Sequence, residues 1–367
     1  MIYIHIPFCK SRCLYCDFFS STSFELKNDF IKALLSEMNH RADEIRFARA
    51  NTVYIGGGTP SQLDISQIAC IFKELTNIVP LEDGAEVTIE CNPDDITLDF
   101  IRGLKSTPVN RISLGLQTLN DKLLTLLRRR HSSTQALMAV DMLRQSGYNN
   151  ISLDLMYGLP GQTLEMWKDD VQRVLSLGIP HLSAYSLQWE EGTPLFSMLE
   201  SGEVTEAPED LSVAMYDYLL TATRTAGMEH YEISNFSIPG MRARHNSGYW
   251  RNEAYVGLGP GAHSYDGDKT RSNNLPDLKA YILSGGTPQR EIEVLTDDEL
   301  YEESVLKGLR TSNGLDLDNL LPRYYEYALK MAKPHIESGN LVRRGNTLIL
   351  TEKGFFVSND IMSDMML

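Results

Sequence analysis

The chain has 367 residues, of which 42% are hydrophobic and 23% charged, a balance typical of a folded globular protein. Its 34 basic and 49 acidic side chains give a net charge of −15, which repels a phosphate backbone and argues against nucleic acid as a partner. No apolar run approaches the ~20 residues that cross a bilayer, so any membrane contact would be peripheral. Only eight residues precede Cys9, too few for a signal peptide, and we expect a cytoplasmic protein.

The first half of the sequence alternates short β-branched runs with longer amphipathic stretches. The alternation predicts a parallel sheet with a helix after most strands. The expected strands are 1–6, 52–55, 86–90, 111–116, 151–156 and 181–187. The expected helices are 25–47, 65–78, 98–105, 133–146, 164–177 and 209–225.

Polar residues follow or end five successive predicted strands. An open sheet concentrates its site at one switch point, whereas a barrel gathers groups from many strands at one rim. The pattern therefore favours an α/β fold with a partial, TIM-like (β/α)6 barrel over residues 1–230.

The remaining sequence divides into two parts. Residues 231–290 form a glycine-rich and aromatic segment and linker. Its stretch 249–265 cannot be assigned to regular structure from the pattern, and we interpret it as a binding loop. Residues 291–367 predict helices at 297–310 and 317–338, then a hairpin at 341–350 that turns at Gly345 and Asn346, then a short helix. That order predicts a smaller C-terminal domain of helical, winged-helix-like type.

Three of the five cysteines, Cys9, Cys13 and Cys16, are spaced C-x3-C-x2-C on the loop after the first strand. Thiolates in this pattern select zinc or an iron-sulfur cluster. Structural zinc needs a fourth protein ligand, for which His5 is the local candidate. A 4Fe-4S cluster held by three cysteines leaves one iron open for a small molecule. We expect Cys70 and Cys91 to be ordinary buried residues.

This cysteine loop resembles the signature of the radical S-adenosylmethionine (SAM) superfamily, in which SAM chelates the open iron. The run Gly56-Gly57-Gly58-Thr59-Pro60 is similar to the superfamily segment whose backbone oxygens accept the methionine amino group. The resemblance implies a SAM cradle in which Glu90 accepts hydrogen bonds from the ribose hydroxyls. The cradle residues that we expect are Tyr3, Gly57, Gly58, Thr59, Glu90, Gln117, Arg129 and Asp154.

The stretches 3–9, 56–60, 111–118 and 152–160 resemble the oxygen-independent coproporphyrinogen III oxidases and their HemW-type relatives. The oxidases carry one more cysteine two places after the third, where this chain has Phe18. They also carry a longer N-terminal segment. Both departures count against the oxidase.

The hexapeptide from His245 to Trp250, His-Asn-Ser-Gly-Tyr-Trp, matches the HNxxYW motif of HemW-type heme chaperones. The resemblance implies heme contacts from His245, Asn246, Tyr249 and Trp250, with His245 as the ligand of the heme iron. His263 is a second candidate ligand. Arg242, Arg244 and Arg251 flank the motif and are candidate partners of the heme propionates.

The favoured hypothesis is a heme chaperone that binds heme, carries a 4Fe-4S cluster with SAM, and passes heme to an unidentified acceptor protein. The alternative is a radical enzyme that oxidatively decarboxylates coproporphyrinogen III. A radical enzyme acting on an unrelated substrate stays open, because superfamily membership does not fix the substrate. The sequence therefore leaves undecided whether the protein is an enzyme.

Overall fold

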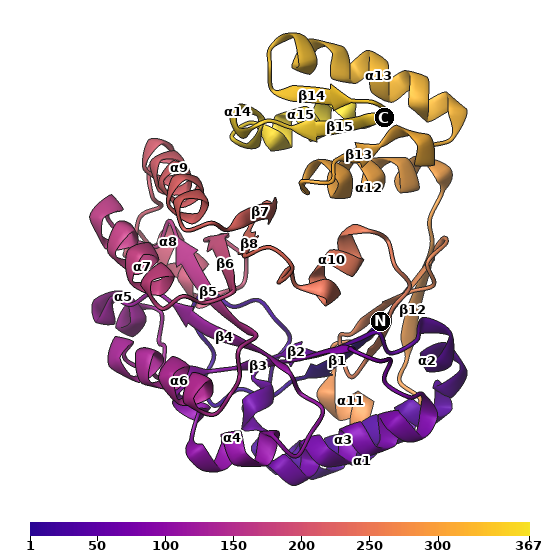
Figure 1. The fold of residues 1–367 in the computed structure, drawn as a ribbon. Helices are drawn as coiled ribbons and strands as arrows, with labels where there is room; N and C mark the ends of the chain where they lie inside the picture. Colours follow the sequence, from indigo (N-terminus) through magenta and orange to yellow (C-terminus); the bar gives the residue numbers. More distant parts are fainter.

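The computed structural model describes all 367 residues and is built on one nine-stranded sheet, in the order β7-β8-β6-β5-β4-β3-β2-β1-β9 (Figure 1). Six consecutive strands are parallel, as predicted, and form the partial barrel. They are β1 (Ile2–Ile6), β2 (Thr52–Gly57), β3 (Glu86–Cys91), β4 (Arg111–Gln117), β5 (Ile151–Tyr157) and β6 (His181–Ser186).

Helices follow the strands and cover the outside of the curved sheet (Figure 1). Side-chain caps fix several starts: Asp64 and Ser132 each form a capping box with the glutamine three residues on. The helix expected at 25–47 is interrupted at Arg41, and α5 and α8 are additional short helices. The helices are α1 (Lys27–His40), α2 (Ala42–Ala48), α3 (Ile65–Ile78), α4 (Leu98–Leu104), α5 (Asp121–Leu126), α6 (Ser133–Gln145), α7 (Leu164–Ser176), α8 (Pro194–Glu200) and α9 (Glu209–Thr225).

Three short strands extend the barrel at its edges, and sequence periodicity missed all of them. The antiparallel strands β7 (Glu229–Glu232) and β8 (Asn235–Ser237) lie beside β6. On the other edge, β9 (Val256–Leu258) pairs in parallel with β1. Strands of three or four residues are too short to show an alternating pattern.

The glycine-rich and aromatic segment carries several short regular elements, three of which include residues of 249–265, the stretch that the sequence pattern does not assign. Its first element, α10 (Arg244–Trp250), contacts β2 on the inner side of the sheet (Figure 1). A three-stranded antiparallel sheet follows: β10 (His263–Tyr265), β11 (Thr270–Asn274) and β12 (Arg290–Val294), with α11 (Leu278–Leu283) between the last two strands.

The C-terminal part has its own hydrophobic core and its own small sheet, in the order β13-β15-β14. Two helices and then a hairpin give the winged-helix-like order that the sequence predicts. The domain boundaries at 230 and 290 stay a prediction. The elements are α12 (Asp297–Leu309), β13 (Leu315–Asp316), α13 (Pro322–Glu337), β14 (Leu341–Arg344), β15 (Thr347–Leu350), α14 (Glu352–Phe355) and α15 (Ser358–Met365).

No helix has the length and apolar character needed to pass through a lipid bilayer. Cys91 is buried, as expected, but Cys70 is exposed on α3, and the expectation that it is buried was wrong. Cys70 lies on the solvent side of an amphipathic helix whose buried residues include Ile68 and Ile71.

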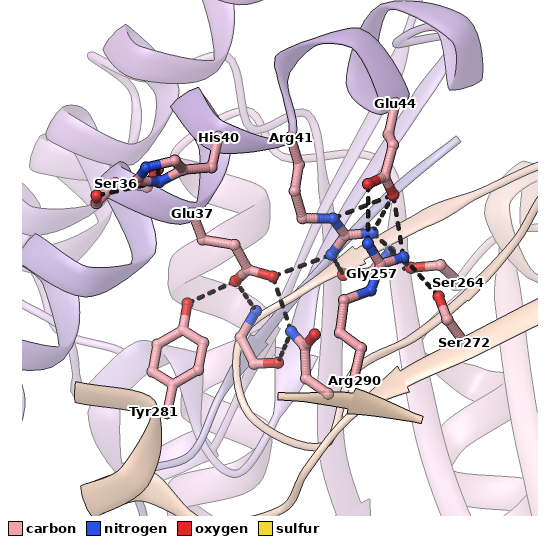
Figure 2. Close-up of polar contacts among 12 residues, drawn as sticks. Ser36, Glu37, His40, Arg41, Glu44, Gly257, Ser264, Ser272, Tyr281 and Arg290 are labelled. Atoms are coloured by element: carbon pink, nitrogen blue, oxygen red, sulfur yellow. Dashed lines mark hydrogen bonds and ion pairs between the residues drawn. The ribbon is translucent and has the colours of Figure 1, made fainter. Parts of the chain in front are cut away.

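The carboxylate of Glu37 on α1 is completely buried and fixes the segment 257–281 to the barrel (Figure 2). It accepts hydrogen bonds from Arg41 at 3.0 Å, the Gly259 amide at 2.9 Å, Asn274 at 2.8 Å and the Tyr281 hydroxyl at 2.6 Å. A buried carboxylate without such partners would be strongly unfavourable. The four donors therefore act as one anchor between α1 and the segment that carries β9, β10 and β11.

Arg41 and Glu44 extend this anchor toward the three-stranded sheet. Arg41 donates to the Gly257 carbonyl at 2.6 Å and to Ser264 at 2.9 Å. Glu44 accepts hydrogen bonds from both Arg41 and Arg290, which together outweigh burial and lower the pKa of Glu44. The ion pairs therefore connect α1 and α2 with β9, β10 and β12.

We predict that Glu37→Gln lowers the free energy of unfolding by about 3 kcal/mol, because it leaves Arg41 buried beside a neutral partner. Asp29→Asn, at an exposed pair with Lys32, is the matched control and should cost less than ~1 kcal/mol. Urea denaturation of both variants measures the difference, and equal effects would contradict the anchoring role.

Candidate functional site

Two cavities lie on the inner side of the sheet. The barrel cavity, about 710 Å³, runs through the barrel interior, and the side cavity, about 640 Å³, lies against β10, β11 and α12. Both volumes suit a cofactor-sized ligand. Five residues line both cavities and form their shared wall: Tyr3, Phe18, Gly57, Glu90 and Tyr249.

The barrel cavity extends from one end of the parallel strands to the other. At the carboxyl ends it is lined by Cys9, Cys13, Cys16, Gly58, Gln117 and Arg129, and at the amino ends by Arg111, His181, His245 and Asn246. The predicted SAM residues thus share one cavity, as expected for residues that follow successive parallel strands.

The three cysteines lie on the loop after β1 and all line the barrel cavity. Cys9 is buried and its Sγ lies 3.2 Å from the Thr59 hydroxyl, while Cys13 and Cys16 are partly exposed. Burial raises the pKa of the Cys16 thiol to about 11, and metal binding would displace that proton. Three thiols facing one cavity fit an iron-sulfur cluster with an open iron.

The alternative of a zinc site closed by His5 does not fit this arrangement. The His5 Nε2 atom is 2.9 Å from the Phe19 carbonyl and Nδ1 is 3.1 Å from the Tyr3 hydroxyl, so both ring nitrogens already have partners. No three His, Cys, Asp or Glu side chains converge as ligands of one metal ion would. A 4Fe-4S cluster binds each cysteine at a different iron and does not need such convergence.

The glycine run after β2 packs so tightly that side chains are excluded. Gly57 has a φ of +105°, and a Cβ there would lie 2.5 Å from the His5 ring. A Cβ on Gly58 would lie 2.8 Å from the Ile6 carbonyl oxygen. Both glycines line the barrel cavity, so their backbone atoms are accessible to a ligand beside the cysteine loop.

Glu90 lies in the shared wall, next to Tyr54 and Tyr3. It accepts a hydrogen bond from the Tyr54 hydroxyl at 2.6 Å and another from the Gly57 amide at 3.1 Å. Burial raises the pKa of Glu90 to about 7, against the lowering effect of the Tyr54 hydrogen bond. Tyr3 stacks on Tyr54, with ring centroids 6.2 Å apart.

Gln117 and Arg129 face each other across Gly115, near the cysteine loop. Gln117 has a φ of +68° at a bulge between β4 and β5, a left-handed conformation that is strained for a residue other than glycine. Arg129 donates to the Gly115 carbonyl and to Asn92 at 2.6 and 2.8 Å, and lies 3.3 Å from the Cys13 sulfur. Its Nε is buried without a partner.

Asp154 projects from the middle of β5 into the barrel cavity, among serine side chains. Ser113 donates to it at 3.1 Å and Ser152 lies 3.5 Å away. Burial raises its pKa in spite of these hydrogen bonds. A carboxyl group with only hydroxyl partners keeps acceptor capacity for a ligand.

The HNxxYW motif forms α10 and lies at the amino ends of β2 and β3, opposite the cysteine loop. The amides of Arg244 and His245 donate to Glu86, the first residue of β3, at 3.0 and 2.9 Å. Tyr249 lines both cavities and Asn246 lines the barrel cavity, whereas Trp250 lines neither. Buried nitrogens of Asn246 and Trp250 lack hydrogen-bond partners.

His245 is buried, and both of its ring nitrogens are occupied. Nδ1 lies 2.7 Å from the Thr52 hydroxyl and Nε2 lies 2.9 Å from the Tyr249 hydroxyl. Burial lowers the pKa of His245 to about 3, so the ring is neutral. Iron ligation by His245 stays a prediction, and it requires the ring to leave Thr52 or Tyr249.

The three arginines that flank the motif are paired with groups other than a ligand. Arg242 pairs with Glu229 at 3.0 Å and Arg251 with Glu253 at 2.6 Å. Arg244 donates to the Gly84 carbonyl at 2.7 Å. None of them lines either cavity.

Sequence reasoning missed two polar residues at the closed end of the barrel cavity. Arg111 is only 2% exposed and its Nε has no partner, although it begins an otherwise apolar strand. His181 is held between Ser152 and Tyr231, each at 2.7 Å. A charged residue inside a predicted strand is unfavourable unless it has a partner, and this argument led from the sequence to Asp154. The same argument could have identified Arg111.

The cysteine loop after β1 and the glycine run after β2 define a radical SAM protein, and the radical SAM superfamily model matches residues 3–174. Heme chaperone HemW of Lactococcus lactis is 34% identical over 100% of this chain and 97% of that protein. HemW of Bacillus subtilis is 34% identical over 98% of this chain and 97% of that protein. The chain therefore belongs to the HemW family.

The solved structure of the coproporphyrinogen III oxidase HemN from Escherichia coli superposes with a TM-score of 0.84. The superposition covers 99% of this chain and 89% of the HemN chain, and the two sequences are 24% identical. The likeness confirms the expected radical SAM fold. Superfamily membership implies a 4Fe-4S cluster and SAM, and the thiols, glycines and acceptors of the barrel cavity fit both.

We predict that Glu90→Gln removes a pH dependence from the stability of the ligand-free protein, so that between pH 4 and pH 8 the variant gains about 1 to 2 kcal/mol relative to the native protein. The folded-state pKa of about 7 exceeds the ordinary 4.5, so the folded chain holds an extra proton between these values. Stability of the native protein should therefore fall as pH rises from about 4.5 through about 7. Urea denaturation across this range measures the slope.

Glu165→Gln, at an exposed carboxylate, is the matched control and should leave the pH profile unchanged. A Glu90→Gln profile parallel to that of the native protein would contradict the raised pKa.

Proposed function

We propose that this protein binds heme and passes it to an acceptor protein, with a 4Fe-4S cluster and SAM bound in the barrel cavity. The observation that carries the proposal is the match, over nearly the whole chain, to proteins named heme chaperone HemW. The acceptor stays unidentified, and we propose that the cycle takes place in the cytoplasm.

In this proposal Cys9, Cys13 and Cys16 hold three irons of the cluster. The backbone of Gly57 and Gly58 lies beside the methionine end of SAM, and Glu90 accepts hydrogen bonds from its ribose. Gln117, Arg129 and Asp154 complete the polar lining. When bound and reduced, the cluster can supply one electron for cleavage of the sulfonium bond.

In this proposal the residues around the cluster and SAM bind these ligands and shield them from solvent, and they need not take part in a reaction. Arg129 lies against Cys13 and places a positive charge beside the cluster position. Phe18, 64% exposed, follows the cysteine loop in sequence and adds an apolar side chain to the shared wall. These features suit a cluster that senses or supports cargo binding, without requiring turnover.

The rival function is oxidative decarboxylation of coproporphyrinogen III. The likeness to Escherichia coli HemN supports it only at the level of the fold. The residue at position 18 is a phenylalanine where the oxidases that this chain resembles have a cysteine. We therefore rank the oxidase second.

We predict that the anaerobically reconstituted protein binds ferric heme saturably and does not convert coproporphyrinogen III to protoporphyrinogen. A Soret titration measures heme binding, and chromatography of porphyrins after incubation with SAM and reductant measures turnover. Cys16→Ser should lose the cluster absorbance and keep heme binding. Vinyl products formed with stoichiometric SAM consumption would overturn the chaperone proposal in favour of the oxidase.

A further inference from the structure

The histidines that line the two cavities differ in what their ring nitrogens contact. His5, His181 and His245 each have both nitrogens within hydrogen-bond distance of another group. His263, on β10, is exposed, lines the side cavity, and has no hydrogen-bond partner at either nitrogen. It is the histidine that can reach a metal without breaking an existing contact.

The apolar lining of the side cavity is entirely aromatic. Tyr249 and Tyr255 meet edge to face at 4.7 Å, and Tyr255 faces Tyr265 at 6.4 Å. Flat side chains suit a flat, conjugated ligand. The six aromatic residues are Tyr3, Phe18, Phe19, Tyr249, Tyr255 and Tyr265.

Two cations lie in the same cavity and keep unused donors. Arg271 and Lys307 both pair with Glu303, and Lys307 also donates to Asn252. Both stand over the Tyr265 ring, at 5.7 and 5.8 Å from its centroid. An arginine has five N–H donors and a lysine three, so each keeps capacity for a further carboxylate.

The two carboxylates that line this cavity, Glu90 and Glu253, both have partners. Glu253 is paired with Arg251. Glu303, which pairs with Arg271 and Lys307, does not line the cavity. Glu90 lies at the shared wall, where it accepts from Tyr54 and Gly57. The free donors are thus concentrated at Arg271 and Lys307.

We propose that the side cavity is the heme seat, with His263 as the axial ligand and Arg271 and Lys307 as partners of the propionates. This inference rests on the proposed function and assigns the site within it. His245 is a positioning residue: it holds the Tyr249 hydroxyl and thereby one wall of the seat. The seat joins four segments of the chain, because Phe18, Tyr249, His263 and Lys307 come from the cysteine loop, α10, β10 and α12.

The shared wall gives this seat a direct connection to the SAM cradle. Glu90, Gly57 and Tyr3 line both cavities, so a ligand in either cavity would lie against the same three residues. In this proposal heme lies in the side cavity and SAM in the barrel cavity, on opposite sides of the shared wall.

The test titrates the full-length native protein with ferric heme and records the Soret band and the electron paramagnetic resonance spectrum. His263→Ala should weaken binding about tenfold and remove the imidazole-ligated iron signal. His245→Ala should keep that signal, although its affinity is reduced. His40→Ala, at an exposed histidine on α1, is the matched control and should behave as native.

Each outcome has a distinct meaning. Absence of heme binding by the native protein would refute the proposed function itself. If the native protein binds heme but the imidazole-ligated iron signal is lost in His245→Ala and kept in His263→Ala, only the site assignment is refuted. Circular dichroism checks that the variants fold, and return of the signal to His263→Gly on adding imidazole separates lost ligation from a disturbed fold.

A second arm tests the propionate partners. Arg271→Gln should weaken binding of heme about tenfold, since it removes a charge-assisted contact, and should leave binding of heme dimethyl ester unchanged. Arg102→Gln, at an exposed pair with Asp99 on α4 and outside both cavities, is the matched control. Equal losses for heme and its dimethyl ester in Arg271→Gln would contradict the propionate assignment.

Discussion

The carboxylate of Glu37 has no contact with water, and the placement of the whole segment 257–281 depends on satisfying it. Four donors, from the junction of α1 and α2, the turn after β9, β11 and α11, meet at this one group, and removing a partner from a buried charge is strongly destabilising. Because the same segment carries His263 and Arg271, the anchor also sets the side cavity. A buried polar interaction whose residues line neither cavity thus helps to place the wall of the side cavity that carries His263 and Arg271.

The second constraint is the parallel direction of the strands, which places different groups of residues at the two ends of the sheet. Loops at the carboxyl ends carry the cysteines, the glycine run and Arg129, while α10 closes the amino ends through Glu86 and Thr52. Between them, Tyr54 touches both regions: its hydroxyl donates to Glu90, and its ring stacks on His245 at 5.2 Å. The motif that resembles a heme signature is therefore connected to the SAM cradle through one tyrosine.

Under the proposed function, separate cavities with a shared wall would let one chain combine a radical SAM site with a non-covalent cargo. A porphyrin seated in the side cavity would contact the cradle at Tyr3, Gly57 and Glu90 without entering the barrel. Glu90 is partly protonated near neutral pH, so a change in charge at this wall would be felt on both sides.

The sequence by itself determined the six parallel strands, the cysteine loop, the glycine run and the C-terminal hairpin, because these depend on periodicity, spacing and turn chemistry within short stretches of chain. It also identified Asp154, since a charge in an apolar strand is informative wherever the strand lies. Only the tertiary structure decided that Thr52 contacts His245, that His263 has no hydrogen-bond partner, and that Arg271 and Lys307 share Glu303. The contact of Thr52 with His245 and that of Arg271 with Glu303 join residues 193 and 32 positions apart, and a local sequence pattern does not indicate which distant residues will meet.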